Sequence, residues 1–311
     1  MPKNKPAVYV GLDIAKVTLQ LHLPDGQHPL PNTAAGHARL VQLLSSVCDA
    51  HVICEATGGY ERGLVAVLHA SNVPVSVVNP AQVRHFALAQ GQRAKNDPID
   101  AALLTAYGQA LCPAATPAPQ SALSELRDLV QWRDHLKEQL TRARQVAEHA
   151  MRPFIRRQQV KEVAHLEKQM SAVEKEIAAA LARAPQQKAQ VEQLAKLDGV
   201  GTLTAVTVLS QMPELGQINR GQTAALAGLA PWTRQSGPWE GQRHIGGGRA
   251  RVRRALYMSA VALARQTQTV LGKFYARLRA AGKPAKVALT AVMRKLLIQM
   301  NLTLKNHALQ S

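Results

Sequence analysis

The chain has 311 residues, enough for about two domains of ~150 residues each. Hydrophobic residues make up 46% of it, which excludes a disordered chain, and the absence of a run of ~18 uncharged apolar residues predicts no membrane span. Residues 232–311 hold 15 Lys or Arg and one acid, whereas residues 1–120 hold 8 bases and 7 acids. This asymmetry favours nucleic acid as the partner, with an anionic membrane surface a distant second.

The N-terminus and the cysteines predict a cytoplasmic protein. The first six residues lead into a strand and not into the apolar core of a signal peptide. Cys48, Cys54 and Cys112 contain no C-x-x-C pair, and we expect them to be buried thiols in a reducing compartment.

The first 120 residues predict a mixed sheet covered by helices. An apolar run at 8–13 reads as a buried strand, and Asp13 interrupts it near its end. A carboxylate there needs a cation, a set of donors or the open end of a sheet; a capping or edge aspartate is the structural alternative. The further expected elements are strands at 17–23, 28–32, 51–54 and 73–78, and helices at 36–50 and 57–69. Strands in hairpins followed by strands alternating with helices match the ribonuclease-H-like layout.

Two acids lie at the start of the next predicted helix. Pro98 keeps Asp97 out of helical geometry and suits the first helical position, so we expect Asp97 to cap the helix and Asp100 to lie in its first turn. The structural interpretation is that free amides and the helix dipole favour acids there. The functional interpretation is that Asp100 projects toward whatever Asp97 faces.

A Pro/Ala linker at 112–120 marks a domain boundary. Beyond it, apolar residues recur at three- and four-residue steps on both sides of Pro153, which predicts two long helices forming an antiparallel arm that packs within the chain or on another subunit. The Leu197–Gly201 segment precedes an apolar helix and resembles the helix-hairpin-helix element of DNA-binding proteins. A plain tight turn explains it equally well.

A Gly- and Arg-rich loop follows, and Ser236 lies in it beside a Gly-Pro pair. A loop serine is usually inert, but a serine that attacks a phosphodiester needs guanidinium groups around the phosphate. The arginines of this segment are therefore candidate nucleic-acid-binding residues: Arg234, Arg243, Arg249, Arg251, Arg253 and Arg254.

Four of the seven acids in residues 1–120 follow strand-like runs or share one helix start. In a ribonuclease-H-like sheet the first strand, the fourth strand and a late helix converge at one edge. Asp13, Glu55, Asp97 and Asp100 would repel one another there without a counter-charge. Mg²⁺ (or Mn²⁺) prefers such oxygen ligands, and two ions about 4 Å apart clamp a scissile phosphate.

These segments together resemble a known family, the DEDD insertion-sequence transposases of insertion-sequence family one-ten, with their pilin-gene-invertase relatives. The resemblance is carried by the Asp13 strand, Glu55-Ala56-Thr57-Gly58, residues 95–101, and Leu229-Ala230-Pro231 followed by Ser236-Gly237. It implies a RuvC-like domain over 1–120, a coiled-coil arm over 121–195 and a mostly helical transposase domain over 196–311. Residues 246–249, Gly-Gly-Gly-Arg, depart from the Lys-x-Gly-Asn that relatives tend to have.

The resemblance also implies a mechanism and partners. Asp13, Glu55, Asp97 and Asp100 would bind Mg²⁺, and Ser236 would form a covalent phosphoserine link to DNA. A structured bridge RNA would pair with donor and target DNA. We also expect a homo-oligomer, a dimer or a tetramer, acting at the bacterial nucleoid.

Three alternatives remain open. Residues 11–15 resemble the first phosphate loop of actin-like ATPases, although no second Asp-x-Gly-Gly-Thr segment follows. A non-catalytic nucleic-acid-binding protein would need no complete set of four acids. A metal-dependent Holliday-junction nuclease would use the four acids and not Ser236, and it is the closest enzymatic rival.

Overall fold

The computed structural model describes residues 8–92, 96–118, 120–149, 152–233, 235–236, 239–241 and 243–308. Contacts divide the chain into two compact units, which we call the N-terminal unit (residues 1–119) and the C-terminal unit (residues 120–311). The finer division into three domains stays a prediction.

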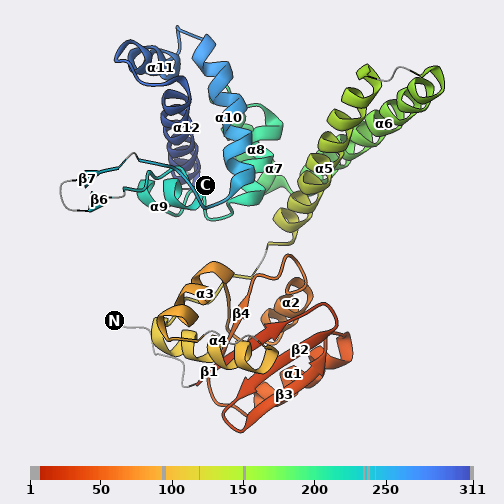
Figure 1. Ribbon diagram of the computed structural model, residues 1–311, viewed down its shortest axis with the longest axis vertical. Coiled ribbons are helices and arrows are strands. Elements are labelled where there is room, and N and C mark those ends of the chain that lie inside the picture. The colour runs from red at the N-terminus through yellow and green to blue at the C-terminus, as the bar shows by residue number, and fades with distance from the viewer. Residues whose placement is uncertain are drawn as a thin grey trace. The chain divides into compact units, whose positions relative to one another are not determined.

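A five-stranded mixed sheet forms the centre of the N-terminal unit (Figure 1). The strand order is β3-β2-β1-β4-β5, with β1 antiparallel to β2 and parallel to β4. The strands are β1 (Val8–Ile14), β2 (Thr18–Leu23), β3 (Gly26–Pro31), β4 (Ala50–Glu55) and β5 (Val75–Val78). This arrangement confirms the predicted α/β unit with a hairpin-first mixed sheet.

Alternation along β1 gives the sheet two apolar faces, because successive side chains point to opposite sides. Val10, Leu12 and Ile14 belong to the core that α1 and α2 cover, whereas Tyr9 packs in a smaller core beneath α3 and α4. The covering helices are α1 (Ala34–Ser45), α2 (Arg62–Ala70), α3 (Pro80–Ala89) and α4 (Asp97–Leu111).

The predicted start of α2 and the predicted burial of all three cysteines are wrong. Helix α2 begins at Arg62 and not at Thr57, because Gly58 and Gly59 take positive φ angles of 76° and 124°, which do not fit a helix. Cys48 and Cys112 are exposed, and only Cys54 is buried. These two cysteines lie at element ends, where the backbone leaves the core.

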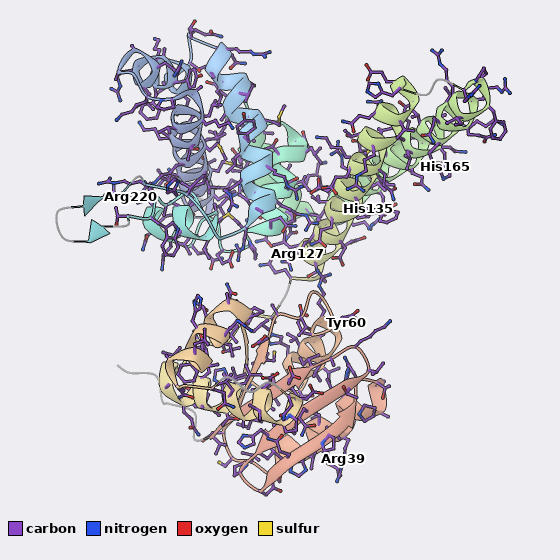
Figure 2. The ribbon with its side chains drawn as sticks, in the orientation of Figure 1. Arg39, Tyr60, Arg127, His135, His165 and Arg220 are labelled. Atoms are coloured by element: carbon purple, nitrogen blue, oxygen red, sulfur yellow. The ribbon has the colours of Figure 1, made fainter. Side chains whose placement is uncertain are left out.

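An antiparallel pair of long helices begins the C-terminal unit, as predicted. We call α5 (Ser121–His149) and α6 (Pro153–Arg183) the arm. Three ion pairs join its two helices in antiparallel order: Glu125 with Arg183, Arg133 with Glu174 and Arg144 with Glu167. Arg183 also bonds Glu176 within α6. At the base of the arm, Arg127 donates to the carbonyl of Ser210 at 3.1 Å (Figure 2).

The rest of the C-terminal unit is a helical bundle with one short hairpin. Its elements are α7 (Pro185–Ala195), α8 (Thr202–Gln211), α9 (Arg220–Leu226), β6 (Gln235–Ser236), β7 (Trp239–Glu240), α10 (Ala250–Arg265), α11 (Val270–Ala280) and α12 (Ala285–Ala308). Helix α12 packs against α7, α9, α10 and α11. Among the described residues it alone is long and apolar enough to cross a membrane, but half of that window is buried in the protein.

Candidate functional site

The carboxyl ends of two parallel strands bring Asp13 and Glu55 together at one edge of the sheet. β1 and β4 pair in register up to Leu12 with Cys54, so Asp13 and Glu55 are the next residues along each strand. Both are half-buried. Side chains two residues apart on a strand lie on the same face of the sheet, so Glu55 shares a face with Ile53, and Asp13 shares one with Tyr9. Ile53 and Tyr9 pack beneath α4. Both carboxylates therefore lie on the face that α4 covers.

Close packing fixes helix α4 on this face. A Cβ added to Gly11 would overlap the carbonyl oxygen of Ala101 and lie 2.7 Å from the amide nitrogen of Thr105. The amide of Gly11 donates to the Thr105 hydroxyl at 2.8 Å, and His22 Nδ1 lies 2.8 Å from the same oxygen. Glycine is required here because the helix backbone lies where a side chain would be.

The direction of α4 carries its first turn toward the level of Asp13 and to the side of β3, where Gln27 donates to the carbonyl of Pro98 at 2.9 Å. Gly108 packs on Tyr9 near the start of β1, while Ala101 packs on Gly11. Moving toward the start of the helix therefore means moving toward Asp13. The four helical residues from Ala101 back to Asp97 cover ~6 Å, and the two strand residues from Gly11 to Asp13 cover ~6.6 Å. Measured along β1, Asp97 therefore lies at about the level of Asp13.

The start of α4 differs from the predicted cap. Asn96, and not Asp97, is the N-cap: its side chain accepts from the Ile99 amide at 3.0 Å. Asn96 has the extended backbone that a cap needs, whereas Asp97 is already the first helical residue. Asp97 is exposed and Asp100 half-buried, and both lie in the first turn of the helix.

We call Asp13, Glu55, Asp97 and Asp100 the acidic edge. The described residues contain no group of three or more His, Cys, Asp or Glu side chains gathered closely enough to hold a metal ion. The structure therefore places Asp13 and Glu55 at the ends of two paired strands, and in the described residues it does not gather three of the four acids into a ligand shell. Lys95, part of the same motif, lies outside the described residues.

Sequence reasoning missed Glu61, which orders the loop after Glu55. Its carboxylate accepts from the amides of Thr57 and Gly59 at 3.0 and 2.8 Å and from the Thr57 hydroxyl at 2.9 Å. Burial works to raise the pKa of Glu61, but these hydrogen bonds outweigh it and lower that pKa. The spacing of Thr57 and Glu61 around two glycines is the signal that would have found it.

Burial and two neighbouring acids act on Cys54, the residue before Glu55. Burial raises the pKa of its thiol to about 12, and the charges of Glu61 and Glu55 act in the same direction. The thiol stays protonated and is no candidate nucleophile.

In the C-terminal unit, the predicted serine lies in a two-stranded hairpin. Ser236 in β6 pairs with Trp239 in β7, and an isolated bridge joins Trp232 to His244. The predicted Arg234 lies outside the described residues.

Two of the predicted arginines hold the loop in shape. Arg249 forms a two-pronged ion pair with Glu214, with both nitrogen–oxygen distances 2.6 Å. Arg253 donates to the carbonyls of Ala227 and Gly247. Burial works to raise the pKa of Glu214, but the hydrogen bond and charge of Arg249 lower it overall.

Two glycines of the segment 246–249 have a structural reason. Gly247 and Gly248 take φ angles of 65° and 60°, which favour glycine. A Cβ on Gly248 would also meet the carbonyl oxygen of Leu226 and the amide nitrogen of Gly228. This close approach positions the start of α10, where Arg249 donates its amide to Leu226 at 2.9 Å.

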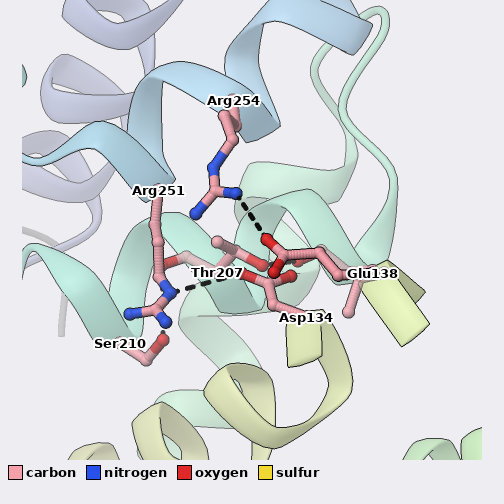
Figure 3. A network of polar contacts seen from close by, with 7 residues as sticks. Asp134, Glu138, Thr207, Ser210, Arg251 and Arg254 are labelled. Carbon is pink, nitrogen blue, oxygen red and sulfur yellow. Dashed lines mark hydrogen bonds and ion pairs between the residues drawn. The ribbon is translucent and has the colours of Figure 1, made fainter. Parts of the chain in front are cut away.

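Two further arginines bond the arm. Figure 3 shows Arg251 pointing to Asp134 and Arg254 to Glu138, both acids coming from α5. The nitrogen–oxygen distances are 3.3 and 3.1 Å. A cavity of about 510 Å³ lies beside these pairs. Of the six predicted arginines, four therefore have partners within the protein, and Arg243 is exposed.

Two family profiles match this chain. Residues 10–154 match a DEDD profile described as "Transposase", and residues 191–276 match one described as "Transposase IS116/IS110/IS902 family". The pilin gene-inverting proteins of Moraxella lacunata and Moraxella bovis are each 28% identical over 300 residues, which cover 93% of this chain and 93% of each relative. The chain therefore belongs to the IS110 family and is a DNA transposase or recombinase.

Proposed function

We propose that this transposase cuts and rejoins DNA strands through a phosphoserine intermediate on Ser236, assisted by Mg²⁺ at the acidic edge. The proposal is supported by Asp13 and Glu55, which follow the paired residues of β1 and β4, and by helix α4, whose first turn carries two further acids and runs toward the level of Asp13. A stable fold has no need of several carboxylates in one place, because like charges repel.

The residues of the acidic edge fit a divalent metal. Mg²⁺ keeps several of its waters and is bound through one or two carboxylates together with phosphate oxygens, which suits acids that share an edge without forming a closed shell. Asp13, Glu55, Asp97 and Asp100 would hold it, and the metal would stabilise negative charge on the phosphate.

Ser236 would supply the nucleophile. Its hydroxyl oxygen forms a bond to phosphorus as one phosphorus–oxygen bond to a deoxyribose breaks, and its proton passes to the released hydroxyl. Because the phosphoserine ester keeps the bond energy, another strand's hydroxyl restores a phosphodiester without an external energy source. A metal-only nuclease would use water and leave free ends.

Charge supports nucleic-acid partners, among them a structured guide RNA with the donor and target DNA. Residues 121–311 hold 30 Lys or Arg and 13 acids, whereas residues 1–120 are almost balanced. Contacts with six or more phosphates would make log K fall with a slope of about −5 or steeper against log salt. A homo-oligomer is part of the proposal.

The serine mechanism is tested with a nicked suicide DNA substrate. Wild-type protein should carry DNA through denaturing electrophoresis, and Ser236→Ala should bind DNA but form no adduct. Thr233→Ala, which removes another hydroxyl of the same loop, serves as the matched control and should form the adduct. Cleavage by Ser236→Ala, or no adduct with the wild type, would put the metal-only nuclease first.

The metal assignment has a readout besides activity. Mg²⁺ should raise the melting temperature of the wild type but not of Asp13→Asn, and Asp13→Asn should lose strand exchange. Asp49→Asn is the control because Asp49 is exposed and its φ of 50° suits asparagine equally well. An equal Mg²⁺ response from all three proteins would remove Asp13 from the metal site.

A further inference from the structure

A second cavity of the C-terminal unit has the composition of a nucleic-acid-binding groove. It measures about 760 Å³, within the ~300–1,000 Å³ typical of ligand sites. Helices α10 and α12, which pack side by side (Figure 1), form its walls together with the segments around Leu229 and His244. We call it the basic groove.

Five cationic side chains line the basic groove: Arg243, Arg253, Arg254, Lys286 and Arg294. No Asp or Glu is among its described lining residues. Arg253 and Arg254 have the partners given above. No acidic partner is recorded among the described residues for Arg243, Lys286 or Arg294. A gathering of cations without counter-charge is electrostatically costly unless an anion binds, and phosphate is the anion that such a groove suits.

The other part of the lining is apolar and exposed. Tyr257 is 42% exposed, Val287 53% and Ile245 39%. A DNA duplex presents phosphates outside and keeps its bases stacked within, so an apolar wall would gain little from it. An unpaired strand exposes base faces, which stack on aromatic side chains while cations follow the phosphates.

The groove adjoins the hairpin that carries Ser236. His244, one of its lining residues, forms a backbone bridge to Trp232, a residue that is 68% exposed. Ser236 follows Trp232 by four residues, and four residues span at most ~14 Å. A strand in the groove would therefore lie close to the proposed nucleophile.

We propose that the basic groove holds unpaired DNA next to the cleaved phosphate, with a base stacked on Tyr257 and phosphates on Arg243, Lys286 and Arg294. The choice of DNA rests on the proposed function, because the strand beside an attacking serine is the one being cut. Exchange of strands requires such a segment to be unpaired, and the groove would keep it from re-pairing.

The stacking contact is tested by fluorescence anisotropy of the full chain with three labelled probes: oligothymidylate, a DNA duplex and oligouridylate. Tyr257→Ala should weaken oligothymidylate binding about fivefold to 100-fold and duplex binding less than twofold, whereas Tyr257→Phe should bind like the wild type. Met258→Ala is the matched control, because Met258 is exposed on the same helix but lines the other cavity.

The phosphate contacts are tested by Lys286→Gln, which should lower the salt slope of oligothymidylate binding by about one. Lys305→Gln removes the same charge from α12 outside the groove and should leave the slope unchanged. Melting curves show whether each variant folds.

If Tyr257→Ala weakens duplex and single-strand binding equally, or weakens neither, the proposal that the groove binds unpaired DNA is wrong. If Tyr257→Ala weakens the binding of oligouridylate more than that of oligothymidylate, the choice of DNA over RNA is wrong. These binding measurements involve no cleavage. If the wild-type protein forms no serine adduct, the proposed function is wrong, but the binding result is unaffected.

Discussion

The acidic edge and the arginines of the C-terminal unit are positioned by different means. Strand register places Asp13 and Glu55 on neighbouring strands, and backbone packing on Gly11 holds α4 against the sheet. Side-chain partners, by contrast, fix Arg249 on Glu214, and Arg251 and Arg254 on the arm.

This difference shows where each region is vulnerable. Main-chain packing is rigid and close to all-or-none, because a displaced helix moves every residue that it carries. Ion pairs at a surface are weaker and depend on salt, so nucleic acid can compete for the same arginines. The positions of the acids should therefore be most sensitive to steric changes, and the ion pairs of the arginines to changes in charge, salt and pH.

The largest effect is expected from Gly11→Ala. The new methyl group would overlap the Ala101 carbonyl of α4, and overpacking against backbone should cost about 3 kcal/mol or more of the free energy of unfolding. Urea unfolding followed by circular dichroism measures this, and strand exchange should be lost as well. Gly63→Ala is the control, since its Cβ would lie 3.8 Å from the nearest atom, in ordinary contact. Equal stability of the two variants would show that α4 does not rest on Gly11.

An intermediate effect is expected from Glu214→Gln. Removing the charge that Arg249 bonds should cost about 1–2 kcal/mol at neutral pH, a range kept modest because both side chains are about one-third exposed. The lowered pKa of Glu214 means that the pair's stabilisation is complete above the usual carboxyl pKa of ~4.3 and is lost as pH falls through the lowered value.

Urea unfolding of the wild type and of Glu214→Gln from pH 7 to pH 3 checks the direction of this pH dependence. The difference in unfolding free energy between wild type and Glu214→Gln should shrink as the solution becomes more acidic. A difference that is constant or grows with acid would contradict the assignment of the shift to Arg249.

The smallest effect is expected at the contact between α10 and the arm. Arg254 and Glu138 are more than half exposed, so a double-mutant cycle of Arg254→Ala and Glu138→Ala should give a coupling energy of about 0.5 kcal/mol or less. High salt should abolish it. A coupling that persists in high salt would place this pair among the structural contacts, with Arg249 and Glu214.

Local patterns predicted much of the fold. An apolar run marked β1, three- and four-residue spacing marked the arm, and short apolar runs before Asp13 and Glu55 marked two strand ends. The cap of α4 could not be read in the same way, because Asn96 and Asp97 are both good capping residues. Only the backbone angles at Asn96 separate them.

The sequence alone indicated the strands of the N-terminal unit, the two helices of the arm and the excess of positive charge near the end of the chain, because these depend on nearest neighbours and on composition. Tertiary structure decided which arginines have acidic partners and which line the basic groove. Tyr257 and Lys286 are 29 positions apart and meet only because α10 packs against α12. Such contacts depend on how helices pack, and no local pattern encodes them.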